Sequence, residues 1–145
     1  MSVLQSTPDQ FVWQLTVWRE AMNQGLDGME AVAWVMINRL KSGKHGGSLM
    51  EVCTERLQFS SMTALGDPMT VKWPTHMNVA EANAWRLAEI ACSGVEDGSV
   101  PDPTHGATYY ANLATAKSGW FFENIVRDTV NHPQTAQINN HTFYR

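Results

Sequence analysis

The chain has 145 residues, which suits one domain with a real core, and its apolar content of 43% and charged content of 17% exclude a disordered protein. The net charge of −4 argues against nucleic acid as the partner, because phosphate binding requires a basic face, and an anionic polymer would have to be gripped locally. The first ten residues lack the apolar run of a signal peptide. No stretch is apolar for long enough to span a membrane. We therefore expect a protein made in the cytoplasm, without stable membrane insertion, that stays there unless something else exports it.

The first half of the chain predicts helices. Thr7 can cap a helix that begins at Pro8, runs to about Asn23 and stops at Gly25, so residues 1–7 are expected to be a short flexible N-terminus. Asp27 repeats the capping pattern before a helix that is apolar at every position from Ala31 to Ile37. The chain then predicts a helix end at Gly43, one or two turns at 48–54, and a long loop at 55–75 of a kind that is often functional.

The second half adds one helix and a little sheet. Asn78 and Glu81 predict a helix start, and Gly94 its end. Residues 108–111 and 141–144 read as two strands that could pair, with a broken helix at 118–130 between them. The predicted fold class is therefore α+β, mainly α, with a helical core and a small antiparallel β element.

Glu20 is the most informative residue. In the first helix, Phe11, Leu15, Trp18 and Met22 form an apolar stripe, and Glu20 ends the neighbouring row after Trp13 and Val17. A carboxyl group that is partly removed from water holds its proton more readily, as a general acid near neutral pH must. A solvated surface Glu is the alternative that this local pattern leaves open.

Other kinds of catalysis have little support. The five histidines have no helical metal-ligand spacing, and Cys53 and Cys92 form no CxxC pair, so no metal and no cofactor are expected. The simplest interpretation of the two cysteines is a pair of reduced, buried thiols, and a disulfide between them is the alternative. A GxSxG elbow and a phosphate-binding glycine loop are both lacking.

A polar and aromatic surface could hold a substrate. Six Trp residues are many for this length, and Trp stacks well on sugar rings as well as filling cores. The segment 57–61, Leu-Gln-Phe-Ser-Ser, interrupts the long loop with an amide, a ring and two hydroxyls, although it could be a structural turn. In the strand at 108–111, Tyr110 and Asn112 should face one side and Tyr109 the other.

Five blocks in order resemble the SleB-like cell-wall hydrolase family of the spore-cortex-lytic type. They are the Glu20 run at 19–24, the buried helix ending in Asn38-Arg39, Gln58-Phe59-Ser60, the Asp102–Asn112 block with its Tyr-Tyr pair, and the closing Asn140–Tyr144. The resemblance extends from about Phe11 to Arg145. It implies a lysozyme-like fold, residues 1–145 as one catalytic domain, and cleavage of the MurNAc–GlcNAc bond of peptidoglycan with Glu20 as the catalytic residue.

We expect Gln58, Ser60, Tyr110, Asn112 and His141 to hydrogen-bond the sugar or its acetamido group. With one carboxylate, the expected reaction is that of a lytic transglycosylase, and a hydrolytic muramidase is the alternative; Asp67, Asp97 and Asp102 stay open as a second acid.

The chain departs from the family pattern in one place, where Met22 and Gln24 replace an Arg and a second Glu. This departure supports a second hypothesis, a peptidoglycan-binding or virion structural module without activity, and a zinc amidase or peptidase is a third. The expected partner is the peptidoglycan glycan strand. The expected context is a bacteriophage, either as an endolysin released through a holin or as a virion-associated lysin in contact with virion proteins.

Overall fold

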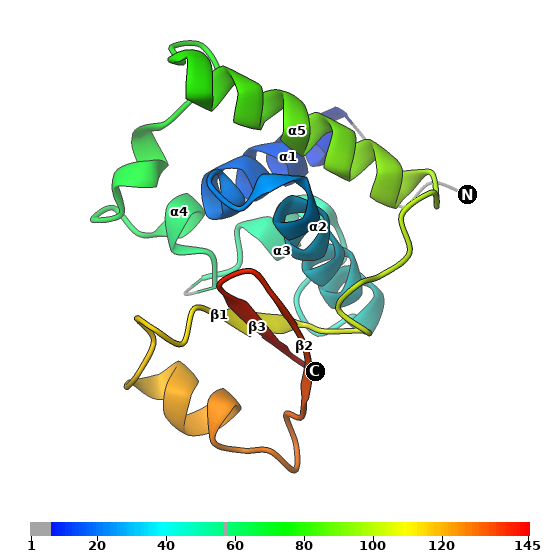
Figure 1. Cartoon of the computed structure of the whole chain (residues 1–145), viewed down its shortest axis with the longest axis vertical. Coiled ribbons are helices and arrows are strands. Elements are labelled where there is room, and N and C mark those ends of the chain that lie inside the picture. Colours follow the sequence, from blue (N-terminus) through cyan, green and yellow to red (C-terminus); the bar gives the residue numbers. More distant parts are fainter. Residues whose placement is uncertain (1–6, 57) are drawn as a thin grey trace.

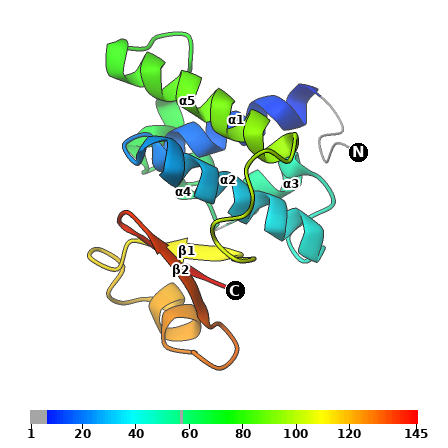
Figure 2. The same cartoon turned by 45° about the vertical axis from the view of Figure 1, so that its right-hand side comes forward.

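The computed structural model describes residues 7–56 and 58–145, so residues 1–6 of the expected flexible segment, and Leu57, lie outside the described residues. Helix α2 (Gly25–Ser42) has other helices on one side and a small sheet on the opposite side (Figures 1 and 2). The elements in chain order are α1 (Thr7–Ala21), α2 (Gly25–Ser42), α3 (Leu49–Cys53), α4 (Ser60–Thr63), the 3-10 helix η1 (Pro68–Val71), α5 (Val79–Glu96), β1 (Tyr109–Ala111), the π-helix η2 (Phe122–Val126), β2 (Gln134–Ile138) and β3 (His141–Tyr144). The mainly α, α+β class is confirmed.

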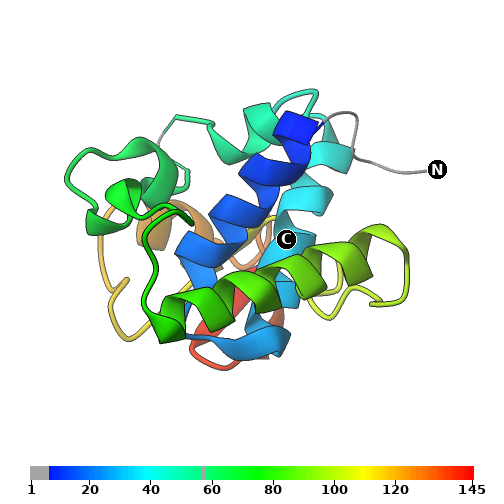
Figure 3. The same cartoon turned by 90° about the horizontal axis from the view of Figure 1, so that it is seen from above.

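The main core lies where α1, α2 and α5 pack together (Figure 3). Trp13, Val17 and Trp18 are fully buried there, so both predicted rows of α1 face protein. Phe11 is 40% exposed, against the prediction of a core position, because it lies outside the buried core cluster and packs at its margin against the ring of Trp85 on α5.

Some helix boundaries agree with the prediction and others differ from it. Asp27 does not cap α2, which already begins at Gly25, whose φ of +75° lets the chain reverse directly after α1. Gly43 ends α2 in the left-handed conformation, as predicted. The capping box of Asn78 and Glu81 is also confirmed, with both reciprocal hydrogen bonds present.

Gly94 does not end α5, which continues to Glu96. A side chain at Gly94 would meet Val100, since a Cβ there would lie 2.8 Å from the Val100 Cγ2 atom. This glycine therefore serves close packing of the turn after the helix.

The sheet has the strand order β1-β3-β2 and is antiparallel throughout. The predicted pairing is confirmed, with Tyr109 opposite Tyr144 and Tyr110 opposite Phe143. The sequence analysis missed β2, which joins β3 through a turn at Asn139, where φ is +53°. Of the predicted broken helix at 118–130, η2 is the main piece. Phe143 is buried with Ala31 and Val35 of α2, and this contact fixes the sheet to the helical core.

Cys53 and Cys92 are both buried free thiols, as predicted, and burial raises the pKa of Cys53 to about 12.

None of the described helices is long and apolar enough to cross a membrane. Within residues 7–56 and 58–145, no three His, Cys, Asp or Glu side chains cluster closely enough to hold a metal ion.

Candidate active site

Glu20 lies in the last turn of α1, and two hydroxyl groups from distant segments converge on its carboxylate. Ser61 of α4 donates to Oε2 and Tyr110 of β1 donates to Oε1, each with an oxygen–oxygen distance of 2.5 Å. The carboxyl group is therefore held at both oxygens in one orientation, partly shielded from solvent.

Arg19 explains how Ser61 reaches Glu20. Its buried guanidinium donates to the carbonyl oxygens of Ser61 (3.1 Å), Thr70 (3.2 Å) and Lys72 (2.7 Å), and it lies 4.7 Å from the centre of the Trp73 ring. One side chain beside Glu20 thus fixes both ends of the loop that carries α4. This loop is part of the long segment that the sequence analysis expected to be functional.

Tyr110 is held by rings on several sides. Its ring centroid lies 4.8 Å from that of His141, 5.8 Å from Phe143 and 6.5 Å from Phe59. Burial, together with the negative charge of Glu20, raises the pKa of Tyr110 well above its ordinary value. The hydroxyl therefore keeps its proton and acts as a donor to the carboxylate.

A cavity of about 470 Å³ opens beside Glu20. Its lining also includes Arg39, Arg56, Gln58, Phe59, Tyr110, Trp120 and Phe121. Among the described residues that line it, Glu20 carries the only carboxyl group. Trp120 is 66% exposed at this cavity, and an exposed indole of this kind is well suited to cover a sugar ring.

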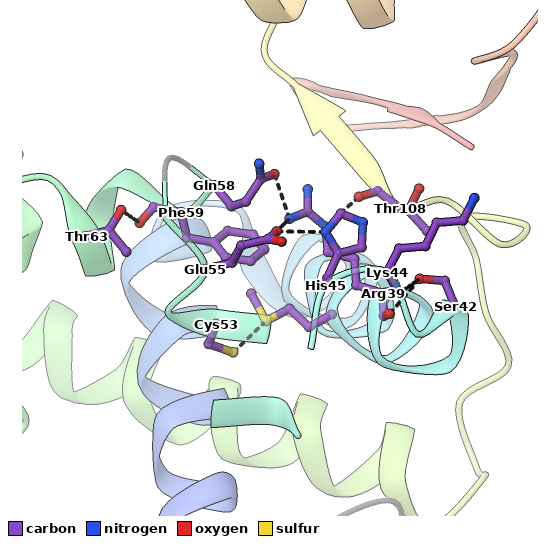
Figure 4. A network of polar contacts seen from close by, with 11 residues as sticks. Arg39, Ser42, Lys44, His45, Cys53, Glu55, Gln58, Phe59, Thr63 and Thr108 are labelled. Carbon is purple, nitrogen blue, oxygen red and sulfur yellow. Dashed lines mark hydrogen bonds and ion pairs between the residues drawn. The ribbon is translucent and has the colours of Figure 1, made fainter. Parts of the chain in front are cut away.

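Arg39, in the lining of the cavity, binds several neighbouring groups (Figure 4). It donates to the side-chain oxygen of Gln58 at 2.9 Å and to the carbonyl of Thr108 at 2.6 Å, and its guanidinium carbon lies 4.8 Å from the centre of the Phe59 ring. A guanidinium has no acceptor, so the amide oxygen of Gln58 must face Arg39. The NH₂ group of Gln58 is thereby left for an acceptor in the cavity.

The other predicted contact residues do not line this cavity. Ser60 donates to Asp67 at 2.7 Å, and the side chain of Asn112 accepts from the backbone of Ala114 in the turn after β1. His141 is 8% exposed and packs on Tyr110, and burial lowers its pKa. Of the five predicted residues, the structure therefore brings only Gln58 and Tyr110 to the cavity beside Glu20.

The three acids that sequence left open as a second carboxylate have other partners. Asp67 caps η1 and accepts from Ser60, and Asp97 accepts from the backbone of Ser99. Asp102 accepts from Asn38 (2.9 Å) and from the turn that follows it. None of the three lines the cavity.

The turn after Glu20, where the chain departs from the family pattern, has its own support. Asn139, in the turn between β2 and β3, donates to the carbonyl of Gln24 at 2.9 Å. Met22 packs against the helical core. The turn is thus held from the sheet, without the two charged residues of the family pattern.

Sequence reasoning missed several residues of the site: Arg19, Arg39, Arg56, Ser61, Trp120 and Phe121. Ser61 and Arg39 lie in two of the predicted motif segments, and Trp120 is one of the six Trp residues for which sugar stacking or core packing was expected. The pattern alone did not indicate which of these side chains would meet.

Comparisons with known proteins identify the family of this chain. The family model described as Cell Wall Hydrolase matches residues 23–144. The chain belongs to the cell wall hydrolase family. The resemblance found in the sequence is thereby confirmed, although Glu20 itself lies three residues before the matched range begins.

A curated relative and two solved structures give the comparison more detail. The chain is 33% identical over 127 residues to the spore cortex-lytic enzyme of Halalkalibacterium halodurans, covering 88% of this chain but only 32% of that protein. The chain thus spans about a third of the length of that relative. The catalytic domain of the germination-specific lytic transglycosylase SleB from Bacillus anthracis matches with a TM-score of 0.67 at 26% identity, over 97% of each chain. The catalytic domain of Bacillus cereus SleB matches with a TM-score of 0.66 at 26% identity, over 100% of this chain and 98% of that one. The lysozyme-like fold expected from the sequence is confirmed.

Proposed function

We propose that residues 1–145 form one catalytic domain that cleaves the MurNAc–GlcNAc bond of peptidoglycan, with Glu20 as the catalytic residue and a lytic transglycosylase reaction. The observation that carries this proposal is the carboxylate of Glu20, clamped by Ser61 and Tyr110 at the mouth of a cavity large enough for a sugar. Membership of the cell wall hydrolase family supports the substrate class.

The proposed reaction uses one carboxyl group twice. Protonated Glu20 gives its proton to the glycosidic oxygen as the bond breaks, and the carboxylate then takes the proton of the MurNAc C6 hydroxyl, which closes a 1,6-anhydro ring. Glycosidases with two carboxylates place both beside the scissile bond. Support for the one-carboxylate reaction comes from the lining of the cavity, in which Glu20 is the only acid among the described residues.

The other cavity residues have proposed roles in binding. Gln58 offers its NH₂ group to a carbonyl oxygen of the substrate, such as that of an acetamido group, and Trp120 covers a sugar ring. Ser60, Asn112 and His141 lie outside the lining, and direct contact of these residues with the sugar stays a prediction.

Digestion of purified sacculi tests the proposal. Wild type should release muropeptides one water lighter than muramidase products, identified by mass spectrometry, and Glu20→Gln should release none. Glu123→Gln, at an exposed residue that does not line the cavity, is the matched control and should behave as wild type. Full-mass reducing ends would favour a hydrolytic muramidase, and binding of sacculi without release would refute the enzyme in favour of a binding module.

The biological context is a separate proposal. We propose a bacteriophage origin, either as an endolysin released through a holin or as a virion-associated lysin. Neighbouring genes test it: holin genes would favour the endolysin, tail genes would favour the virion component, and bacterial sporulation genes would refute both.

A further inference from the structure

A second cavity, of about 450 Å³, is lined in part by Tyr109. The Tyr109 ring meets Phe121 of the catalytic cavity at a centroid distance of 6.1 Å and His132 of the second cavity at 5.4 Å. Arg39, which holds Gln58 in the catalytic cavity, also donates to the carbonyl of Thr108, which lines the second cavity. Tyr109 and Arg39 thus connect the linings of the two cavities.

The lining of the second cavity is basic. Lys44, His45, His132 and Arg145 all contribute to it, together with neutral side chains, and no described Asp or Glu does. Lys44 and Arg145 are exposed and form no ion pair within the described residues. These two side chains give the cavity its positive charge, in a chain whose net charge is −4. We call this site the basic cavity.

Three carboxylates near the basic cavity already have hydrogen-bond or ion-pair partners. Glu55 lies 2.7 Å from the Nδ1 atom of His45 and 3.8 Å from Arg39. Asp128 accepts from Asn131, and Asp102 accepts from Asn38. These carboxylates bind residues of the lining, and no ion pair with Lys44 or Arg145 is present among the described residues. In Figure 4, Lys44 extends from the end of α2 on the same side as Thr108.

We propose that the basic cavity binds a carboxylate of the peptide stem of the glycan strand that is cleaved beside Glu20. This inference rests on the proposed function. The sugar backbone of such a strand is neutral, and the free carboxylates of its stem peptides are its anionic groups. Lysine and arginine at the mouth of a concave site attract and bind carboxylates. The basic cavity thus supplies the local grip that an acidic protein needs on an acidic polymer.

The test compares two soluble substrates: glycan strands with free carboxylates on their stem peptides, and the same strands after these carboxylates have been converted to neutral amides. Wild type should show a higher kcat/KM on the strands with free carboxylates. Lys44→Glu should lower kcat/KM on those strands by about tenfold and leave the amidated strands nearly unchanged, because the lost attraction and the new repulsion act only on the carboxylate. Arg86→Glu, the same charge reversal on an exposed position of α5, should change neither value.

The outcomes separate this inference from the proposed function. Equal use of both substrates by wild type, or an equal loss on both in Lys44→Glu, would overturn the role of the basic cavity while leaving the glycosidic reaction intact. Cleavage of neither substrate by wild type would refute the proposed function and this inference with it.

Discussion

The two hydroxyl groups on Glu20 make a quantitative prediction about catalysis. Tyr110→Phe and Ser61→Ala each remove one donor from the carboxylate and leave the rest of the side chain close to its original size. When Glu20 gives its proton to the glycosidic oxygen it becomes charged, so the lost donor matters more in the transition state than before it.

The magnitude follows from the difference between the two protonation states. A hydrogen bond to a charged group contributes about 1.5–3 kcal/mol, and one to a neutral group about 0.5–1.5 kcal/mol. Removing one donor should therefore raise the barrier by about 1–2 kcal/mol, which corresponds to a fall in kcat of roughly 5- to 30-fold. KM should change little, because each hydroxyl donates its only proton to Glu20 and not to the substrate.

The assay is the initial rate of release from soluble glycan strands, measured from pH 4 to pH 9. Tyr144→Phe removes a tyrosine hydroxyl that does not contact Glu20, and it should match wild type. An unchanged kcat in Tyr110→Phe, or a change confined to KM, would refute the role given to this donor.

Two further predictions concern binding and stability. Trp120→Ala should raise KM by about 2- to 13-fold with kcat nearly unchanged, as expected for a lost aromatic contact of about 0.5–1.5 kcal/mol, and an unchanged KM would contradict stacking of a sugar on this ring. Burial alone would raise the pKa of Asp102, but hydrogen bonds from Thr104, Asn38 and Gly106 outweigh burial and hold this pKa below its usual 3.8. The ionised carboxylate therefore stabilises the fold above pH 3.8, and this stabilisation is lost as the pH falls below that value. Asp102→Asn should therefore lower the free energy of unfolding in urea by about 1–3 kcal/mol at pH 7 and by less at pH 3, whereas a constant difference at both values would contradict this role.

Local patterns in the sequence were enough for most of the elements. The capping box at Asn78 and Glu81 fixed the start of α5, because it depends only on residues three apart. The pairing of 108–111 with 141–144 followed from strand-like composition at both segments. The sequence missed β2, whose residues 134–138 are mostly polar or small and are stabilised by pairing with β3 rather than by their own pattern.

The site shows the limit of such patterns most clearly. The sequence placed Glu20 near the end of an amphipathic helix and predicted that Ser60 and Tyr110 hydrogen-bond the sugar. The choice of Ser61 over Ser60 depends on α4, where neighbouring side chains point about 100° apart, since a helix has about 3.6 residues per turn. No periodicity can be read from a single turn of helix.

The sequence by itself determined most helices and the pairing of two strands, because these follow from spacing within short segments. It pointed to Glu20 as the catalytic carboxylate through the family resemblance, and that role stays a prediction. Tertiary structure alone decided which partners surround that carboxylate. Arg19 reaches carbonyl groups 42 to 53 residues away, and Tyr110 reaches Glu20 across 90 residues. Contacts between such distant segments form only when the sheet packs on α2 and the α4 loop closes over α1. They leave no repeating signal in the chain.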